Sequence, residues 1–199
     1  MNKKITNHIA SPKNKVVNFV TTNVHKFEEA QNLLANFEIS IAKLSVEAVE
    51  IQDVHLENIA KYSVLDAVKN CGLPVFVEDA GLFIEALNEF PGPYSKYVLQ
   101  RVGLKGVLKL MENVENRNAC FKSAICFGGP DEEPTCFVGK VEGKISLELR
   151  GDSGFGYDPI FVPSEGDGRT FAEMSLPEKN CYSHRARALK LFAEWYSRR

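Results

Sequence analysis

The fold is decided by the stretch Val16-Val17-Asn18-Phe19-Val20-Thr21-Thr22-Asn23-Val24-His25-Lys26, near the start of this 199-residue chain. Residues 16–20 are apolar and largely β-branched, which is typical of a short buried strand. The polar residues that follow favour a helix N-cap. From Lys26 onwards, apolar residues recur at helical spacing. This order of strand, polar turn and helix predicts the first unit of an α/β fold.

The rest of the chain shows patterns typical of further helices and strands. Gly72 and Pro74 are expected to end a second helix, because glycine suits a helix C-terminus and proline cannot continue a helix. Before and after that helix we predict an extended segment at 40–52 and a buried strand at 75–77 that ends at Glu78-Asp79. A helix around 104–111 is followed by paired strands at 119–127 and 135–149, with a turn at 128–131. A strand at 160–162 and a helix from Ser183 complete the chain. Parallel-looking and hairpin-like parts together indicate an α/β fold with an elongated mixed β-sheet flanked by helices, and two lobes with a substrate cleft between them. Residues 1–15 are expected to be a flexible arm and residues 16–199 a single domain of two lobes.

Composition narrows the class of protein. Of the residues, 44% are hydrophobic and 25% charged, and the net charge is -2. These values suit a soluble globular domain and argue against a nucleic acid partner. Nothing in the sequence approaches the ~20 apolar residues of a membrane span, and the polar start is not a secretory signal. Five cysteines without C-x-x-C spacing predict reduced thiols and a cytoplasmic location.

The loop at residues 21–26 is a candidate phosphate site. A loop between a buried strand and a helix presents free backbone N–H groups and the positive end of a helix dipole. Thr21, Thr22 and Asn23 add side-chain donors, and Lys26 adds a positive charge. The alternative is that Asn23 only caps the helix and Lys26 is a solvated surface residue.

The doublet Glu78-Asp79 is a candidate metal site. Carboxylates at the carboxyl end of a strand lie where α/β folds place their sites. Glu50 precedes the second predicted helix and could join them. Converging carboxylates would suit magnesium (Mg2+), which takes oxygen ligands. The alternative is that these are capping or solvated carboxylates.

Two later segments are candidates for binding an aromatic ligand. In the glycine-rich segment 151–159, Phe155 could stack on a base and Asp158 could accept hydrogen bonds from its edge; the alternative is a tight turn around a core aromatic. His184 and Arg185 fall in the first turn of a helix. Cations there oppose the helix dipole, so they are expected to face a ligand or an acidic neighbour.

Together these segments resemble the inosine triphosphate pyrophosphatase family, the deaminated-purine nucleoside triphosphate pyrophosphatases. The resemblance extends from about Val16 to Tyr196. It is carried by four ordered motifs: Thr21-Thr22-Asn23-Val24-His25-Lys26; Glu78-Asp79-Ala80-Gly81-Leu82 with Pro91-Gly92-Pro93-Tyr94-Ser95; Gly154-Phe155-Gly156-Tyr157-Asp158-Pro159-Ile160-Phe161; and Thr170-Phe171-Ala172-Glu173-Met174 with Glu178-Lys179-Asn180 and Ser183-His184-Arg185.

The resemblance implies Mg2+-dependent hydrolysis of a nucleoside triphosphate, such as ITP, dITP or XTP, to the monophosphate and pyrophosphate, by a homodimer. It implies that Asp79 is the catalytic base and, with Glu50, a metal ligand. The substrate contacts that it implies are Thr21, Thr22, Asn23, Val24, His25, Lys26, Lys61, Ala80, Lys96, Phe155, Gly156, Tyr157, Asp158, Lys179, His184 and Arg185.

The sequence departs from the family pattern at three positions. Ala80 stands where serine or threonine is common, Thr22 replaces a glycine, and His25 is a less usual residue before Lys26. These departures leave the expected reaction class unchanged but bear on affinity and base preference. A related pyrophosphatase for other nucleotides and a non-catalytic nucleotide sensor remain the rival interpretations.

Overall fold

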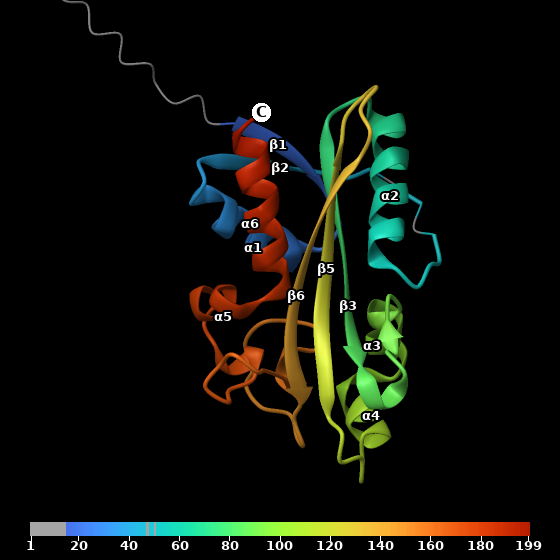
Figure 1. The fold of residues 1–199 in the computed structure, drawn as a ribbon, viewed down its shortest axis with the longest axis vertical. Helices are drawn as coiled ribbons and strands as arrows, with labels where there is room; N and C mark the ends of the chain where they lie inside the picture. Colours follow the sequence, from blue (N-terminus) through green and yellow to red (C-terminus); the bar gives the residue numbers. More distant parts are fainter. Residues whose placement is uncertain (1–14, 47, 50) are drawn as a thin grey trace, which may run out of the picture.

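The computed structural model describes residues 15–46, 48–49 and 51–199. Within them the chain forms seven strands and six α-helices (Figure 1). In chain order these are β1 (Lys15–Val20), α1 (Val24–Ala35), β2 (Ile39–Leu44), α2 (Leu56–Cys71), β3 (Val75–Ile84), β4 (Pro91–Gly92), α3 (Ser95–Arg101), α4 (Gly103–Leu110), β5 (Asn118–Gly128), β6 (Thr135–Ile145), β7 (Phe161–Pro163), α5 (Leu176–Tyr182) and α6 (His184–Ser197). Of the predicted N-terminal arm, only Lys15 is described, and it opens β1.

The strands form one mixed sheet in the order β2-β1-β3-β5-β6-β7, and β4 pairs with the far end of β3. β2, β1 and β3 are parallel, whereas β3, β5, β6 and β7 are antiparallel. β1 and β2 are parallel because a helix connects them, and such a crossover returns the chain to the same end of the sheet before the next strand begins. The predicted mixed sheet flanked by helices is confirmed, and the molecule is elongated along β3, β5 and β6 (Figure 1).

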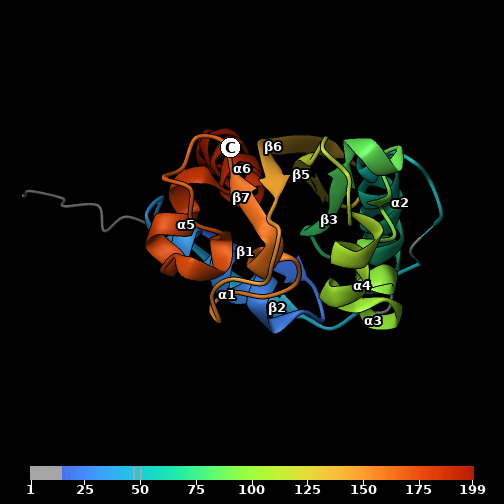
Figure 2. The same ribbon diagram turned by 90° about the horizontal axis from the view of Figure 1, so that it is seen from below.

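Helices cover both faces of the long strands (Figures 1 and 2). On one face, α1 and α6 bury Leu34 and Phe192 against Phe76 of β3. On the other face, α2 buries Val64 among strand residues that include Val75 and Val77. Side chains of a strand alternate between faces, so odd-numbered residues at the start of β3 face α2 and even-numbered residues face α1 and α6.

β3 is longer than the sequence predicts. It does not end at Glu78-Asp79 but continues to Ile84, because β5 pairs with it along its whole length. On the other edge of β3, β1 pairs only with Val75 and Phe76, and β4 joins at Leu82. Among the described residues, no strand pairs with that edge at residues 77–81. This gap leaves the backbone edge of β3 without a neighbouring strand beside the carboxylate doublet.

Helix termini are formed as the sequence indicates. The Asn23 side chain accepts the Lys26 backbone N–H at the start of α1, and the Ser183 side chain accepts the Ala186 N–H at the start of α6. Gly72 ends α2 in the left-handed conformation, with a φ of 66°, which glycine adopts without steric cost. Two seven-residue helices, α3 and α5, were not predicted, and β6 ends at Ile145 rather than at 149.

Two of the five cysteines are not the reduced thiols that the sequence predicts. Cys126 and Cys136 lie directly opposite each other on β5 and β6 and form a disulfide. Their ten-residue separation gave no recognisable motif, and only the hairpin register brings them together. Cys71, Cys120 and Cys181 are free.

Across the described residues, no helix is both long enough and apolar enough to cross a membrane.

Candidate active site

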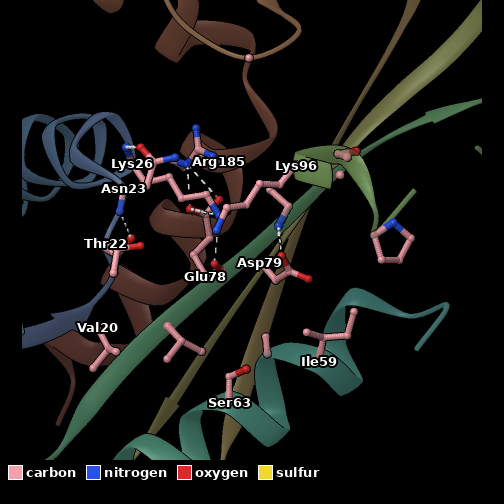
Figure 3. A pocket seen from close by; sticks show the side chains of 18 of the residues that line it. Val20, Thr22, Asn23, Lys26, Ile59, Ser63, Glu78, Asp79, Lys96 and Arg185 are labelled. Atoms are coloured by element: carbon pink, nitrogen blue, oxygen red, sulfur yellow. Dashed lines mark hydrogen bonds and ion pairs between the residues drawn. The ribbon is translucent and has the colours of Figure 1, made fainter. Parts of the chain in front are cut away.

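A cleft of about 1240 Å³ opens at the gap in the sheet. Its floor is the middle of β3, and four other segments enclose it (Figure 3). They are the loop after β1, the loop before α2 together with one face of α2, the first turn of α3, and the base-side loop (residues 154–158) with Lys179, His184 and Arg185. The structure therefore gathers most of the predicted site residues around one cavity.

The loop after β1 brings polar groups to the cleft at the N-terminus of α1. Thr21, Thr22, Asn23 and Lys26 line the cavity. Thr21 Oγ1 accepts the Asn23 backbone N–H at 3.1 Å, and Asn23 Oδ1 accepts the Lys26 N–H at 3.2 Å, which fixes the turn. Asn23 therefore caps the helix and also lines the cleft. Lys26 is not the solvated surface residue of the alternative interpretation, because only 18% of its side chain is accessible. Val24 and His25 are exposed and lie outside the lining.

Glu78 lies at the centre of a buried charged network beneath this loop. Arg185 Nε donates to both of its oxygens, at 2.9 and 3.0 Å, and Ser123 Oγ donates at 2.7 Å. Lys26 Nζ lies 3.6 Å from Oε2 and donates to the Glu78 carbonyl at 3.1 Å. Burial alone would raise the pKa of Glu78, but Arg185 and then Lys26 outweigh burial and lower it to about 2. Glu78 is thus a charged partner of the cations and is not available as a proton acceptor near neutral pH.

Glu29 extends the network to the opposite helices. Its carboxylate accepts Lys179 Nζ at 2.8 Å and also pairs with Arg185. Lys179 in turn donates to Asp158 Oδ2 at 2.6 Å. The carboxylates of Glu29, Glu78 and Asp158 therefore balance the positive charges of Lys26, Lys179 and Arg185. Sequence reasoning missed Glu29; its place beside Ala30 on the apolar stripe of α1 was the available signal, because a buried carboxylate needs a partner.

His184 faces the cleft as a buried, neutral ring. It stacks on Phe121 with ring centroids 4.5 Å apart and an interplanar angle of 11°. Burial and then the charge of Arg185 lower the pKa of His184 well below its usual value. Within the described part of the chain, its Nδ1 atom is buried and has no hydrogen-bond partner. His184 itself lines the cleft, and an unpaired buried polar atom is rare in a folded protein.

The base-side loop places Phe155 over the network. Lys179 Nζ and Arg185 Cζ lie 4.9 and 5.3 Å from the Phe155 ring centroid, and His25 stacks on the ring at 5.1 Å. Phe155 is therefore a half-buried cleft residue and not a core aromatic.

The loop's shape depends on Asp158, whose Oδ2 accepts the Phe155 backbone N–H at 2.8 Å. Gly154 has a φ of +71°, and a Cβ atom there would lie 2.2 Å from that same oxygen. Asp158 is thus committed to internal partners, although it was expected to accept hydrogen bonds from a base.

Asp79 belongs to a different wall of the cleft. Because strand residues alternate, it points away from the Glu78 network, towards Lys96 and the α2 residues Ile59 and Ser63 (Figure 3). Its Oδ1 accepts the Ala80 backbone N–H at 3.0 Å. Lys96 lines this wall from the first turn of α3. Lys61 is exposed on α2 and is not among the lining residues, so its contact with a substrate stays a prediction.

The predicted metal ligands are only partly testable here. Glu50 lies outside the described residues. In the described part of the chain, no three His, Cys, Asp or Glu side chains cluster as a metal site. Magnesium in nucleotide sites is commonly held by one or two carboxylates with phosphate and water oxygens, so Asp79 at the cleft fits that chemistry without a third protein ligand.

Fold and site define an α/β protein with a deep cleft at a gap in a mixed sheet, in which a helix N-terminus and lysines face a carboxylate. The model of the Ham1 family matches residues 17–195. This chain belongs to the Ham1 family.

Similar proteins agree with that assignment. The chain is 49% identical over 181 residues to a dITP/XTP pyrophosphatase of Methanothermobacter marburgensis, covering 91% of this chain and 96% of the relative. It is 48% identical over 178 residues to a dITP/XTP pyrophosphatase of Methanopyrus kandleri, covering 89% and 94%. Among solved structures, a HAM1 protein from Coxiella burnetii has a TM-score of 0.82 at 32% identity, covering 93% of this chain and 100% of that one.

Proposed function

We propose that this protein hydrolyses deaminated purine nucleoside triphosphates, such as dITP, ITP and XTP, to the monophosphate and pyrophosphate. The observation that carries the proposal is the division of the cleft by β3. Asp79 faces a cavity whose opposite wall is the polar N-terminus of α1, while its neighbour Glu78 is held in ion pairs. The dITP/XTP pyrophosphatase names of the similar proteins support the substrate class.

The triphosphate would lie between the α1 N-terminus and Lys96. The loop at residues 21–26 offers backbone N–H groups and the helix dipole. Lys26 is partly exposed, with 18% of its side chain accessible, and can share its ammonium between Glu78 and a phosphate. Lys96 approaches from the other wall, and Lys61 would reach the phosphates only from the outer side of α2.

Asp79 would act on the attacking water. Its carboxylate orients the water and accepts a proton as the water oxygen bonds to the α-phosphorus. The bond from the α-phosphorus to the oxygen that bridges it to the β-phosphorus breaks, and pyrophosphate leaves. A bound Mg2+ ion, held by Asp79 and Glu50, would supply charge neutralisation on the phosphates. The chain's main contribution is to position these groups and to provide an electrostatic environment prepared in advance.

The base would lie at the opposite end, against Phe155, Gly156 and His184. Lys179, Arg185 and Asp158 would support this pocket from below, because their charges are already mutually paired. A site with hydrogen-bonding groups matched to a 6-oxo purine leaves them unpaired against a 6-amino purine, which can give discrimination of ~10⁴ or more.

Three finer points belong to the same proposal. The metal is Mg2+, the active species is a homodimer, and the location is the cytoplasm. The first rests on the oxygen-donor chemistry of the site, and the other two on the family resemblance. Light scattering of the purified protein tests the dimer, and cell fractionation tests the location.

The deciding experiment measures pyrophosphate release from ITP, XTP, dITP, GTP, ATP and CTP, with Mg2+ and with EDTA. We expect Mg2+-dependent cleavage of ITP, dITP and XTP with little cleavage of ATP. Preferential cleavage of other nucleotides would retain the reaction and overturn the substrate class. Tight binding without cleavage would make the protein a nucleotide sensor.

A further inference from the structure

Tyr157 joins two walls of the cleft. Its ring is buried in the same core as Val98 of α3, and its hydroxyl donates to the Ser95 carbonyl at 2.7 Å. Burial raises the pKa of Tyr157, and the Leu99 backbone N–H only partly opposes this, so the hydroxyl remains a donor at neutral pH. A residue from the base-side loop thus ends on the first turn of α3.

That turn of α3 is held in place from three directions. Ser95 Oγ accepts the Leu82 backbone N–H at 2.8 Å and donates to the Gly92 carbonyl at 2.7 Å. These two bonds tie Ser95 to β3 and β4, and the Tyr157 hydroxyl adds the bond from across the cleft. The next residue is Lys96, whose side chain lines the cavity.

The residue after Tyr157 also fixes the base-side loop. Asp158 is bound to Lys179 and to the Phe155 backbone N–H. Adjacent residues therefore anchor the loop in opposite directions, Asp158 to the charged network and Tyr157 to α3. The loop that carries Phe155 is therefore linked through Tyr157 to the turn that carries Lys96.

We propose that Tyr157 is a positioning residue, which holds Lys96 at the phosphate end of the cleft through its hydrogen bond to Ser95. The proposal rests on the proposed function, since it uses the phosphate role of Lys96. It differs from a direct base contact, because the Tyr157 hydroxyl is already bound to a carbonyl. Loss of the hydroxyl should therefore weaken the handling of all purine triphosphates alike.

The test compares Tyr157→Phe with Tyr97→Phe, which removes a hydroxyl from the same helix region at a residue that is 62% exposed. One lost hydrogen bond predicts about a tenfold fall in kcat/KM for Tyr157→Phe, mainly through KM, and no change for Tyr97→Phe. The ratio of kcat/KM between dITP and dGTP should be unchanged, and Tyr157→Phe should have no further effect in a Lys96→Ala background. An altered base ratio, or a full additional loss in that background, would overturn the proposal.

A readout that needs no turnover separates this proposal from the proposed function. In the unliganded protein, backbone amides of α3 should exchange hydrogen faster in Tyr157→Phe than in wild type or Tyr97→Phe. If the wild-type protein cleaves none of the nucleotides, the proposed function fails while this exchange difference still tests the link to α3. Equal exchange in all three proteins would refute the positioning role.

Discussion

The two faces of β3 treat adjacent carboxylates in opposite ways. Glu78, with 1% of its side chain accessible, is enclosed by Arg185, Lys26 and Ser123. Asp79 faces the open cleft from the other side of the strand. The comparison shows that a sequence doublet need not be a functional pair, because a strand sends consecutive side chains to different environments. Glu78 pairs with the cations of the buried network, whereas Asp79 lines the cleft.

The largest expected effect is a loss of turnover when Asp79, on the open face of β3, is changed. Asp79→Asn should lower turnover of dITP by roughly 10²–10⁴-fold because the variant lacks the general base, while the protein remains folded. Pyrophosphate release and a thermal melt measure the two properties. Asp131→Asn, at an exposed turn between β5 and β6, is the matched control and should be unchanged. Near-normal turnover in Asp79→Asn would remove Asp79 from the catalytic role.

The next effect is a loss of stability when the charged network on the enclosed face of β3 is disrupted. Glu29→Gln leaves Lys179 and Arg185 without part of their buried compensation, and removing one partner of a buried pair costs about 3–5 kcal/mol. Urea unfolding measures this as a fall in the free energy of unfolding. Glu28→Gln changes the neighbouring residue, which is 60% exposed, and should shift stability by less than about 0.5 kcal/mol. Equal behaviour of the two variants would mean that the network does not stabilise the fold.

A smaller effect tests the pocket above the enclosed network. Phe155→Ala should raise KM for dITP by an amount equivalent to ~1–3 kcal/mol if a base stacks on the ring. Phe90→Ala, at an exposed phenylalanine outside the cleft lining, is the control. An unchanged KM would show that Phe155 serves its contacts with His25, Lys179 and Arg185 instead.

The last effect is that of acid on the enclosed face. The pKa of Glu78 is about 2 in the folded protein, against an ordinary value of 4.5. Its stabilising contribution is complete above about pH 4.5 and is lost as the pH falls towards 2. The difference in unfolding free energy between wild type and Glu78→Gln should therefore be constant from pH 7 to 5 and shrink below that range. A difference that already shrinks between pH 7 and 5 would contradict the lowered pKa.

Local patterns predicted much of this fold. The strand at 16–20, the cap at Asn23, the end of α2 at Gly72 and the β5–β6 hairpin all depend on neighbours in the sequence. The extension of β3 beyond Asp79 was not predictable, because it depends on pairing with β5 about 45 residues away. The short helices α3 and α5 were missed since seven residues show too little periodicity.

The site was predicted as a set of residues but not as an arrangement. Sequence motifs selected Lys26, Asp79 and Phe155, and all three line the cleft. They did not indicate that Arg185 and Lys179 are neutralised by Glu29, which lies 156 and 150 positions away. Such long-range pairing depends on how α1 packs against the C-terminal helices.

The geometry at Gly154 limits which substitutions the base-side loop can accept. Its left-handed backbone and the 2.2 Å approach of a Cβ atom to Asp158 Oδ2 exclude larger residues. Removing the carboxylate at position 158 would leave Lys179 with Glu29 as its remaining acidic partner. A larger residue at position 154 would push the Asp158 carboxylate aside. The shape of the base-side loop therefore ties the residue types at positions 154 and 158 to each other.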